Sequence, residues 1–224
     1  MKALITGASS GIGLEMAKYL SSLGHEVILV ANDERKLNSV KDVMTTNAKV
    51  YCYDLSVMDN CFLLYDKVKD EKIDIVINNA GYGIFGDYEM DNIDREMNMI
   101  DLNVKCLHIL TKLFVNNKNT KYIMNVASSA GLMKGGLRRR GVDKHISVLC
   151  PGPVDTNFNK VANVKFNIKS LEAPEVAKYA IDKMFKNKLL IIPGTTVRLG
   201  VFLSRFLPLK TLLKITYNIQ DKKR

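Results

Sequence analysis

Short apolar segments alternate with amphipathic stretches along most of this chain of 224 residues. Continuous apolar runs such as Glu26–Val30 are typical of strands buried on both faces of a parallel sheet. Leu14, Ala17 and Leu20 lie at helical spacing and predict a helix over Leu14–Leu23. Similar patterns predict further strands and helices, namely strands over Lys2–Thr6, Lys49–Tyr53, Ile73–Ile77, Tyr122–Val126, His145–Cys150 and Leu189–Ile192, and helices over about Ile93–Phe114 and Pro174–Phe185. Because strands and helices alternate, we expect an α/β fold with a doubly wound parallel sheet.

A chain of this length is most simply one domain, which we expect over residues 1–196, with a C-terminal extension over residues 197–224. The extension mixes apolar residues with frequent basic ones, and Pro208 interrupts it. Charges this frequent rule out a helix that spans a membrane. Two interpretations stay open: a lid packed on the substrate side of the domain, or an amphipathic segment that makes peripheral contact with an anionic membrane.

The composition, 47% hydrophobic and 25% charged, is ordinary for a globular protein. The net charge of +10 is spread along the chain, with local density at Arg138–Arg140 and near the C-terminus, which indicates a solvated surface, a site for a phosphorylated cofactor, or contact with anionic lipid. Basic residues are not interleaved with aromatic ones, so no nucleic acid partner is expected. The four cysteines lack ligand spacing, so we expect free thiols and no metal. No secretory segment follows Met1, which predicts a cytoplasmic protein.

The sharpest local motif is Thr6-Gly7-Ala8-Ser9-Ser10-Gly11-Ile12-Gly13, between the first predicted strand and the first predicted helix. Gly7 permits a tight turn, Gly11 lets the backbone approach a pyrophosphate, and Gly13 allows close packing of helix on sheet. The start of the helix then offers free N–H groups and the positive end of its dipole to phosphates. In this context the motif predicts a dinucleotide site of the Rossmann type.

The glycine spacing resembles that of the classical short-chain dehydrogenase/reductase family, and further motifs of the family follow in order over nearly the whole chain. By this resemblance, Asp54-Leu55 would contact the adenine and Asn79-Ala80-Gly81 would border the cofactor. Asn103 resembles the helix asparagine of the catalytic tetrad, and Ser128 resembles the catalytic serine. The segment Pro151-Gly152-Pro153-Val154-Asp155-Thr156 resembles the Pro-Gly segment of the family. By this resemblance, Val154 and Thr156 would face the nicotinamide carboxamide. The resemblance implies hydride transfer between a nicotinamide cofactor and a small carbonyl or alcohol substrate.

The family's catalytic Tyr-x-x-x-Lys is missing from its expected place. No tyrosine lies between Gly131 and Cys150, and Gly141 and His145 stand at the corresponding distances from Ser128. A phenol with a reference pKa of about 10 needs a neighbouring cation to work near neutral pH, and a serine and an asparagine cannot replace it. Tyr65–Lys69 and Tyr179–Lys183 fit ordinary helix faces, and Tyr82 is the nearby phenol that could substitute.

The space for the family's crossover helix is missing too. Only 16 residues separate Ser128 from His145, which is enough for a parallel crossover but not for the long helix that the family places there. We therefore expect this helix to be largely absent, leaving apolar sheet surface uncovered, lowering solubility and disrupting the homo-oligomer interface implied by the resemblance.

The cofactor preference is set after the second predicted strand. The family's NAD-preferring members carry an acid at the position of Ala31, and its NADP-preferring members often carry arginine at the position of Asn32, so neither rule is met. With no acid at the ribose, and with Arg35 and Lys36 near enough to meet a 2′-phosphate, NADP is favoured and NAD is not excluded.

Three hypotheses about function follow from these residues. The first is an NADP-dependent oxidoreductase with Ser128 and Asn103 as its catalytic residues. The second is a dinucleotide-binding protein without catalysis. The third is an internally deleted remnant of a working enzyme.

Overall fold

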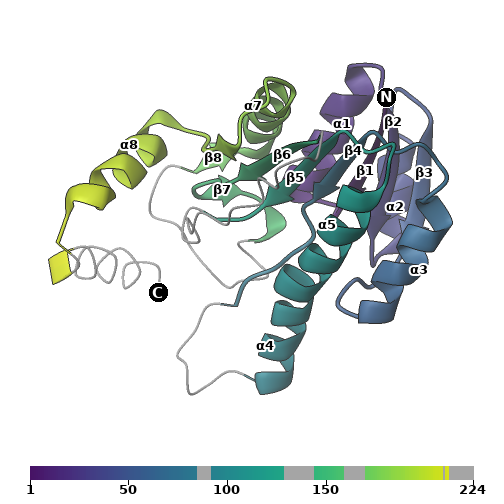
Figure 1. Cartoon of the computed structure of the whole chain (residues 1–224), viewed down its shortest axis with the longest axis horizontal. Helices are drawn as coiled ribbons and strands as arrows, with labels where there is room; N and C mark the ends of the chain where they lie inside the picture. The colour runs from purple at the N-terminus through teal and green to yellow at the C-terminus, as the bar shows by residue number, and fades with distance from the viewer. Residues whose placement is uncertain (85–91, 129–143, 159–169, 209, 212–224) are drawn as a thin grey trace.

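The computed structural model describes residues 1–84, 92–128, 144–158, 170–208 and 210–211, and shows a parallel sheet with helices on both faces (Figure 1). In these residues the sheet has seven strands in the order β3-β2-β1-β4-β5-β6-β9. Their bounds are β1 Lys2–Thr6, β2 Glu26–Ala31, β3 Ala48–Cys52, β4 Ile75–Asn78, β5 Tyr122–Val126, β6 His145–Leu149 and β9 Leu190–Ile191. The strand order reverses between β1 and β4, so the sheet is doubly wound and the predicted fold class is confirmed.

Two layers of helices bury the two faces of the sheet. Helices α1 (Gly11–Ser22), α2 (Glu34–Lys41) and α7 (Ala173–Phe185) cover one face. Helix α3 (Met58–Val68) and the long helix formed by α4 (Ile93–Ile100), η1 (Asp101–Cys106) and α5 (Leu107–Asn116) lie on the other. Alternate residues of β1 divide between the two cores, with Ala3 and Ile5 in the first and Leu4 in the second, and all three are fully buried. Burial on both faces explains the continuous apolar runs.

Most predicted elements are present, with shifted ends. The strands over Lys2–Thr6 and Tyr122–Val126 have the predicted bounds, whereas the first helix begins earlier than predicted, at Gly11. The predicted helix over Ile93–Phe114 is continuous but contains the π-helical turn η1. Several short elements were not predicted: α2, the small parallel pair β7 (Val154–Asp155) and β8 (Leu171–Glu172), α8 (Thr195–Leu203) and the 3₁₀ turn η3 (Ser204–Phe206). Helix α2 and the β7–β8 pair are too short or too polar to show a clear period, whereas most of α8 and all of η3 lie in the stretch that the sequence indicates only as a C-terminal extension.

The outer strands are less well covered than the inner ones. Ile123 of β5 is fully buried, but its neighbour Ile146 of β6 is only half-buried. On the same face Val148 is half-buried, and the adjacent Leu190 is 42% exposed. Among the described residues, the apolar side chains on this part of the sheet are therefore only partly covered, and the expectation of an uncovered apolar surface stays a prediction. The predicted loss of the crossover helix itself concerns residues 129–143, which lie outside the described part of the chain.

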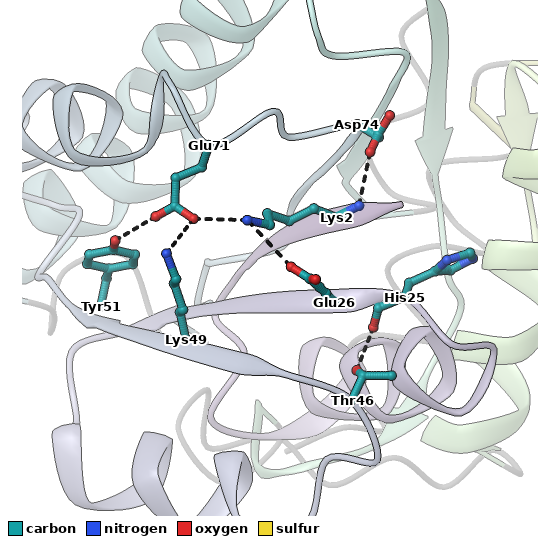
Figure 2. Close-up of polar contacts among 8 residues, drawn as sticks. All are labelled: Lys2, His25, Glu26, Thr46, Lys49, Tyr51, Glu71 and Asp74. Carbon is teal, nitrogen blue, oxygen red and sulfur yellow. Dashed lines mark hydrogen bonds and ion pairs between the residues drawn. The ribbon is translucent and has the colours of Figure 1, made fainter.

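A charged network ties together the amino-terminal ends of the strands (Figure 2). Glu71, which follows α3, accepts hydrogen bonds from Lys2 Nζ at 3.1 Å, Lys49 Nζ at 2.7 Å and Tyr51 Oη at 3.0 Å. Lys2 Nζ also lies 3.5 Å from a carboxylate oxygen of Glu26. Burial raises the pKa of Glu71, but the hydrogen bonds from the three donors outweigh burial and the net shift is downward. The network therefore requires the ionised carboxylate.

The chain after β9 continues into α8, which extends to one side of the domain (Figure 1). Helix α8 begins at Thr195 and so crosses the boundary expected between residues 196 and 197, and that division stays a prediction. Among the described helices, none combines the length and the apolar character needed to cross a bilayer.

Candidate functional site: a cavity at the carboxyl ends of the strands

A cavity of about 970 Å³ lies at the carboxyl ends of the central strands. It includes the point where the strand order reverses between β1 and β4, the usual ligand position in open α/β sheets. The structure brings most of the predicted site residues to its wall: Gly7, Ser9, Ser10, Gly11, Ile12, Asn32, Asp54, Leu55, Asn79, Ala80, Gly81, Asn103, Ser128, Pro151, Gly152, Val154 and Thr156. Of the predicted residues, Gly13 and Arg35 are not part of the wall.

The turn between β1 and α1 forms the floor of the cavity. Gly7 and Gly11 have φ angles of +65° and +57°, a region that residues with a Cβ rarely adopt. Gly13 lies beneath the turn, where an added Cβ would sit only 2.4 Å from the Gly7 carbonyl oxygen. Ser10 precedes α1, but its side chain does not cap the helix, and the first turn of α1 contains no acidic residue. The first N–H groups of α1 and the positive end of its dipole therefore suit phosphate oxygens.

Asn79 braces this turn from the neighbouring strand. Its amide nitrogen donates hydrogen bonds to the carbonyl oxygens of Thr6, at 3.1 Å, and Gly7, at 3.3 Å. The Thr6 hydroxyl in turn accepts from the backbone N–H groups of Asn79 and Ala80, each at 3.0 Å. The Asn79-Ala80-Gly81 segment after β4 thus holds the glycine turn in place through its backbone and one side chain.

At the end of β2, two charged residues line the cavity beside Asn32. Asp33 caps α2, because its carboxylate accepts from Lys36 N at 3.1 Å, and Lys36 Nζ lies 3.1 Å from its other oxygen. These contacts lower the pKa of Asp33, the backbone hydrogen bond from Lys36 most of all. Arg35 is exposed on the surface of α2, whereas Lys36 reaches the cavity wall. Sequence reasoning did not include Asp33, although its place just after a strand was the available signal.

A chain of hydrogen bonds runs along one side of the cavity from β3 to α4. Asp54 accepts from the Ser56 hydroxyl at 2.7 Å, and Ser56 accepts from the Asn98 amide at 2.8 Å. The Tyr82 hydroxyl lies 2.9 Å from the Asn98 amide oxygen and 2.8 Å from the Arg95 carbonyl oxygen. Asp54, expected beside the adenine, is therefore connected to the residues around Asn103. No local sequence pattern indicates Ser56 or Asn98, because their role depends on contacts between distant segments.

Asn103 holds the segment after β4 through both ends of its amide. Its oxygen accepts from Tyr82 N at 3.1 Å and its nitrogen donates to the Tyr82 carbonyl oxygen at 2.7 Å. Asn103 lies in η1, where the backbone departs from regular α-helix, a common feature of functional sites. Burial raises the pKa of Tyr82, and its hydroxyl is engaged with α4. Arg95 nearby acts to lower this pKa, but burial outweighs it, so the surroundings do not activate the Tyr82 phenol as a general acid–base near neutral pH.

Ser128 and the segment after β6 form the remaining wall. Ser128 follows β5, whose continuation is fixed by a hydrogen bond from Ala127 N to the Leu149 carbonyl oxygen at 2.7 Å. Thr156 faces the glycine turn, since an added Cβ on Gly11 would lie 3.4 Å from the Thr156 side chain. Gly152 touches Val197 of α8 closely enough that an added Cβ would sit 2.7 Å from it.

The basic residues near the position where the resemblance leads us to expect a lysine lie at the end of the sheet opposite the cavity. Lys144 precedes β6 and donates to the carbonyl oxygens of Asn117 and Thr120. His145 stacks on Tyr122 at the amino end of β5, with ring centroids 5.3 Å apart. The amino ends of parallel strands face away from the cavity, so neither Lys144 nor His145 can replace the family's lysine.

The two other Tyr-x-x-x-Lys pairs are also outside the cavity wall. Tyr65 packs edge-on against Phe114, and Lys183 lies over the Tyr179 ring on α7. Their positions agree with the helix-face interpretation. In the described part of the chain, no cluster of His, Cys, Asp and Glu has a geometry that could hold a metal ion.

Comparison with known proteins gives consistent matches over most of the chain. The family model for short chain dehydrogenases matches residues 1–140. An uncharacterised oxidoreductase of Staphylococcus epidermidis is 30% identical, with 88% of this chain and 96% of that protein covered. A 3-oxoacyl-[acyl-carrier-protein] reductase of Rickettsia prowazekii is 27% identical, with 88% of this chain and 94% of that protein covered.

Solved structures show the same architecture. A short-chain dehydrogenase from Sphingobium yanoikuyae in complex with NADPH has a TM-score of 0.77 and 23% identity, with 100% of this chain and 96% of that chain covered. A short-chain dehydrogenase/reductase from Burkholderia phymatum in complex with NAD also has a TM-score of 0.77, with 21% identity and coverage of 91% and 92%. At these identities the likeness shows the fold.

Proposed function

Because the chain belongs to the short-chain dehydrogenase/reductase family of NAD(P)-dependent oxidoreductases, we propose that it binds NADP(H) and catalyses hydride transfer to or from a small carbonyl or alcohol substrate. The observation that carries this proposal is the glycine turn at the open N-terminus of α1, which Asn79 braces at the bottom of the cavity. When bound there, the nicotinamide supplies the hydride chemistry. The chain itself supplies the turn that receives the phosphates and the wall that positions the substrate.

Lys36 supports the choice of NADP(H). It lines the cavity beside Asn32, and its ammonium group already contacts one carboxylate, that of Asp33. A 2′-phosphate at this place would give Lys36 a second anionic partner. We expect Lys36→Gln to raise the Kd for NADPH by roughly tenfold or more, because a hydrogen bond to a charged group contributes about 1.5–3 kcal/mol. The Kd for NADH should change little, and an equal effect on both cofactors would contradict the role given to Lys36.

Ser128 is the residue assigned to the substrate oxygen. Its hydroxyl can donate a hydrogen bond to a carbonyl, while Asn103 keeps the neighbouring wall in place through Tyr82. The residues between Gly131 and Cys150 contain no phenol, so the proton at the substrate oxygen would come from water. A positioned general acid contributes about 10²–10⁴-fold to a rate, and we expect turnover to be lower by a factor of that order than with the full family motif.

The second candidate function is NADP(H) binding without turnover. It is favoured by the engagement of the Tyr82 hydroxyl with α4 together with the missing Tyr-x-x-x-Lys. An internal deletion relative to a working enzyme would produce the same site, and comparing the gene and the intact mass of the protein with this sequence tests that origin.

One experiment separates the candidates. Binding of NADPH and NADH is measured by fluorescence, and NADPH oxidation is followed with a panel of aldehydes and ketones, for the wild-type protein and Ser128→Ala. Turnover that Ser128→Ala abolishes supports hydride transfer at this cavity. Tight NADPH binding without turnover supports the second candidate, and failure to bind either cofactor contradicts both.

A further inference from the structure

Helix α8 and the turn η3 carry an apolar stripe on their outer side, formed by Leu199, Phe202, Leu203 and Phe206. These side chains are spaced i, i+3, i+4 and i+7, so they share one face of the helix. All four are exposed, by 58%, 55%, 50% and 72% respectively. The two phenylalanine rings contact each other edge-on, with centroids 5.2 Å apart. A stripe of this kind normally faces a core, and here it faces away from one.

The opposite side of α8 fixes this orientation. Val197 and Val201 are half-buried, and Val197 packs against Gly152 in the cavity wall. The Arg198 guanidinium lies 5.9 Å from the centre of the Tyr179 ring on α7. Contacts on the inner side therefore hold α8 against the domain while the apolar stripe points outward.

The charge of the same segment is strongly positive. Residues 197–224 contain a single acidic residue, Asp221, and seven basic ones, Arg198, Arg205, Lys210, Lys214, Lys222, Lys223 and Arg224. This excess accounts for more than half of the net charge of +10. Apolar residues flanked by basic ones are the composition of helices that lie in the plane of an anionic membrane surface.

We propose that the apolar stripe of α8 and η3 docks onto an anionic lipid bilayer, to which the net positive charge of residues 197–224 attracts it. Phenylalanine and leucine side chains would enter the boundary between headgroups and acyl chains, where their apolar surface leaves water. A second copy of this chain fits the stripe less well, because it would bring a second positive segment to the same place. The inference is independent of the proposed oxidoreductase function, since it involves neither cofactor nor turnover.

Co-sedimentation of the full chain with vesicles tests the proposal. The vesicles contain either phosphatidylcholine alone or phosphatidylcholine with about one third phosphatidylglycerol. The expected result is binding to the anionic vesicles only, weakened at least tenfold when NaCl is raised from about 0.1 to 0.5 M, because salt screens the headgroup attraction. This measurement uses the wild-type protein and requires no variant to fold.

Substitution of the stripe provides the second part of the test. Phe202→Ser combined with Phe206→Ser should weaken binding to the anionic vesicles by tenfold or more, since burying either ring contributes a factor of about ten or more to a partition equilibrium. The matched control is Phe62→Ser combined with Leu63→Ser on α3, whose side chains are 47% and 51% exposed on another part of the surface. The control should bind vesicles like the wild type, and thermal unfolding checks that both variants are folded.

Several outcomes would overturn the proposal. They are equal binding to both vesicle types, no binding to either, and binding that the two serine substitutions in the stripe leave unchanged. Dimerisation in gel filtration that these substitutions abolish, without vesicle binding by the wild type, would identify a second copy as the occupant and would also overturn it.

Discussion

Replacing Gly13 by alanine perturbs the proposed phosphate-binding turn without adding charge or polarity. An ideal Cβ on Gly13 would lie 2.4 Å from both the Gly7 carbonyl oxygen and the Asn79 amide nitrogen. Ordinary contacts of a Cβ begin at about 3.4 Å, so the turn and α1 would have to separate by about 1 Å. Neither neighbour can withdraw easily, because one is backbone and the other donates hydrogen bonds to Thr6 and Gly7.

The size of the effect follows from this displacement. Overpacking of a tight contact costs about 1–3 kcal/mol, which for a chain of this length lowers the melting temperature by roughly 2–12 °C. A shift of about 1 Å also removes the turn from hydrogen-bonding distance of a bound pyrophosphate, and losing one or two such bonds raises the Kd for NADPH by about 10–100-fold. Fluorescence titration with NADPH and thermal unfolding measure the two effects separately.

Two other glycines provide matched controls. Gly24 ends α1 with a φ of +82° and open space around its Cβ position, so Gly24→Ala should lower stability by about 1–2 kcal/mol through backbone strain and leave the Kd unchanged. Gly200 lies within α8 with open space and no positive φ, so Gly200→Ala should leave the Kd unchanged and raise stability by up to about 1 kcal/mol, because alanine favours a helix interior. If Gly13→Ala bound NADPH as tightly as Gly24→Ala does, the assignment of the turn as the phosphate site would be refuted.

Three further predictions concern other parts of the molecule. Glu71→Gln should lower the free energy of unfolding at pH 7 by about 1–3 kcal/mol, because Lys2 and Lys49 lose an ionised partner that is mostly buried. Because folding lowers the pKa of Glu71, the stabilisation by its carboxylate is complete above about pH 5 and is lost as the pH falls through the folded-state pKa. Urea titrations should therefore give free energies of unfolding for the wild type and Glu71→Gln that converge in acid. A difference that stays constant with pH would contradict the network. Asn98→Ala should weaken NADPH binding several-fold, because Asn98 links Ser56 to Tyr82 at the side of the cavity. The loss of stability should be small because Asn98 is exposed, and an unchanged Kd would argue against the link. Gel filtration and light scattering should show self-association of the wild type, driven by the half-covered outer strands, and a sharp, reversible melt of a clean monomer would count against this prediction.

The sheet was predictable because its strands are buried on both faces and separated by regular helices. Residues such as Leu4 and Ile5, on opposite faces of β1, are both fully buried, so the strand appears in the sequence as an unbroken apolar run. Helix α2 escaped detection because only Leu37 and Val40 of its residues are buried. The π-helical turn η1 could not be foreseen either, since the sequence pattern predicts one regular helix through it, and the Tyr82 backbone that Asn103 contacts lies 21 positions away.

The candidate site was predictable to the extent that its residues are local in sequence. Glycines of a turn and residues just after strands can be recognised from their neighbours alone. The hydrogen-bonded chain through Ser56 and Asn98 brings together segments 42 positions apart, and no local pattern encodes it. Arg35 and Lys36 are adjacent and both basic, and the structure was needed to show that Lys36 is the one at the cavity wall.

Strands β5 and β6 are paired in register over five residues, from Tyr122 opposite His145 to Val126 opposite Leu149. Their alignment is anchored by backbone hydrogen bonds and by Lys144, so it does not depend on a long segment between them. Lengthening a connection costs little, about 0.6 kcal/mol of loop-closure free energy for each doubling. A crossover helix carrying Tyr-x-x-x-Lys could therefore be inserted between Gly131 and Lys144, because the two strands that it would connect are already paired in register. If the variant with the inserted helix reduced carbonyl compounds faster than the wild type, the ratio of the two rates would measure what this one helix contributes to catalysis.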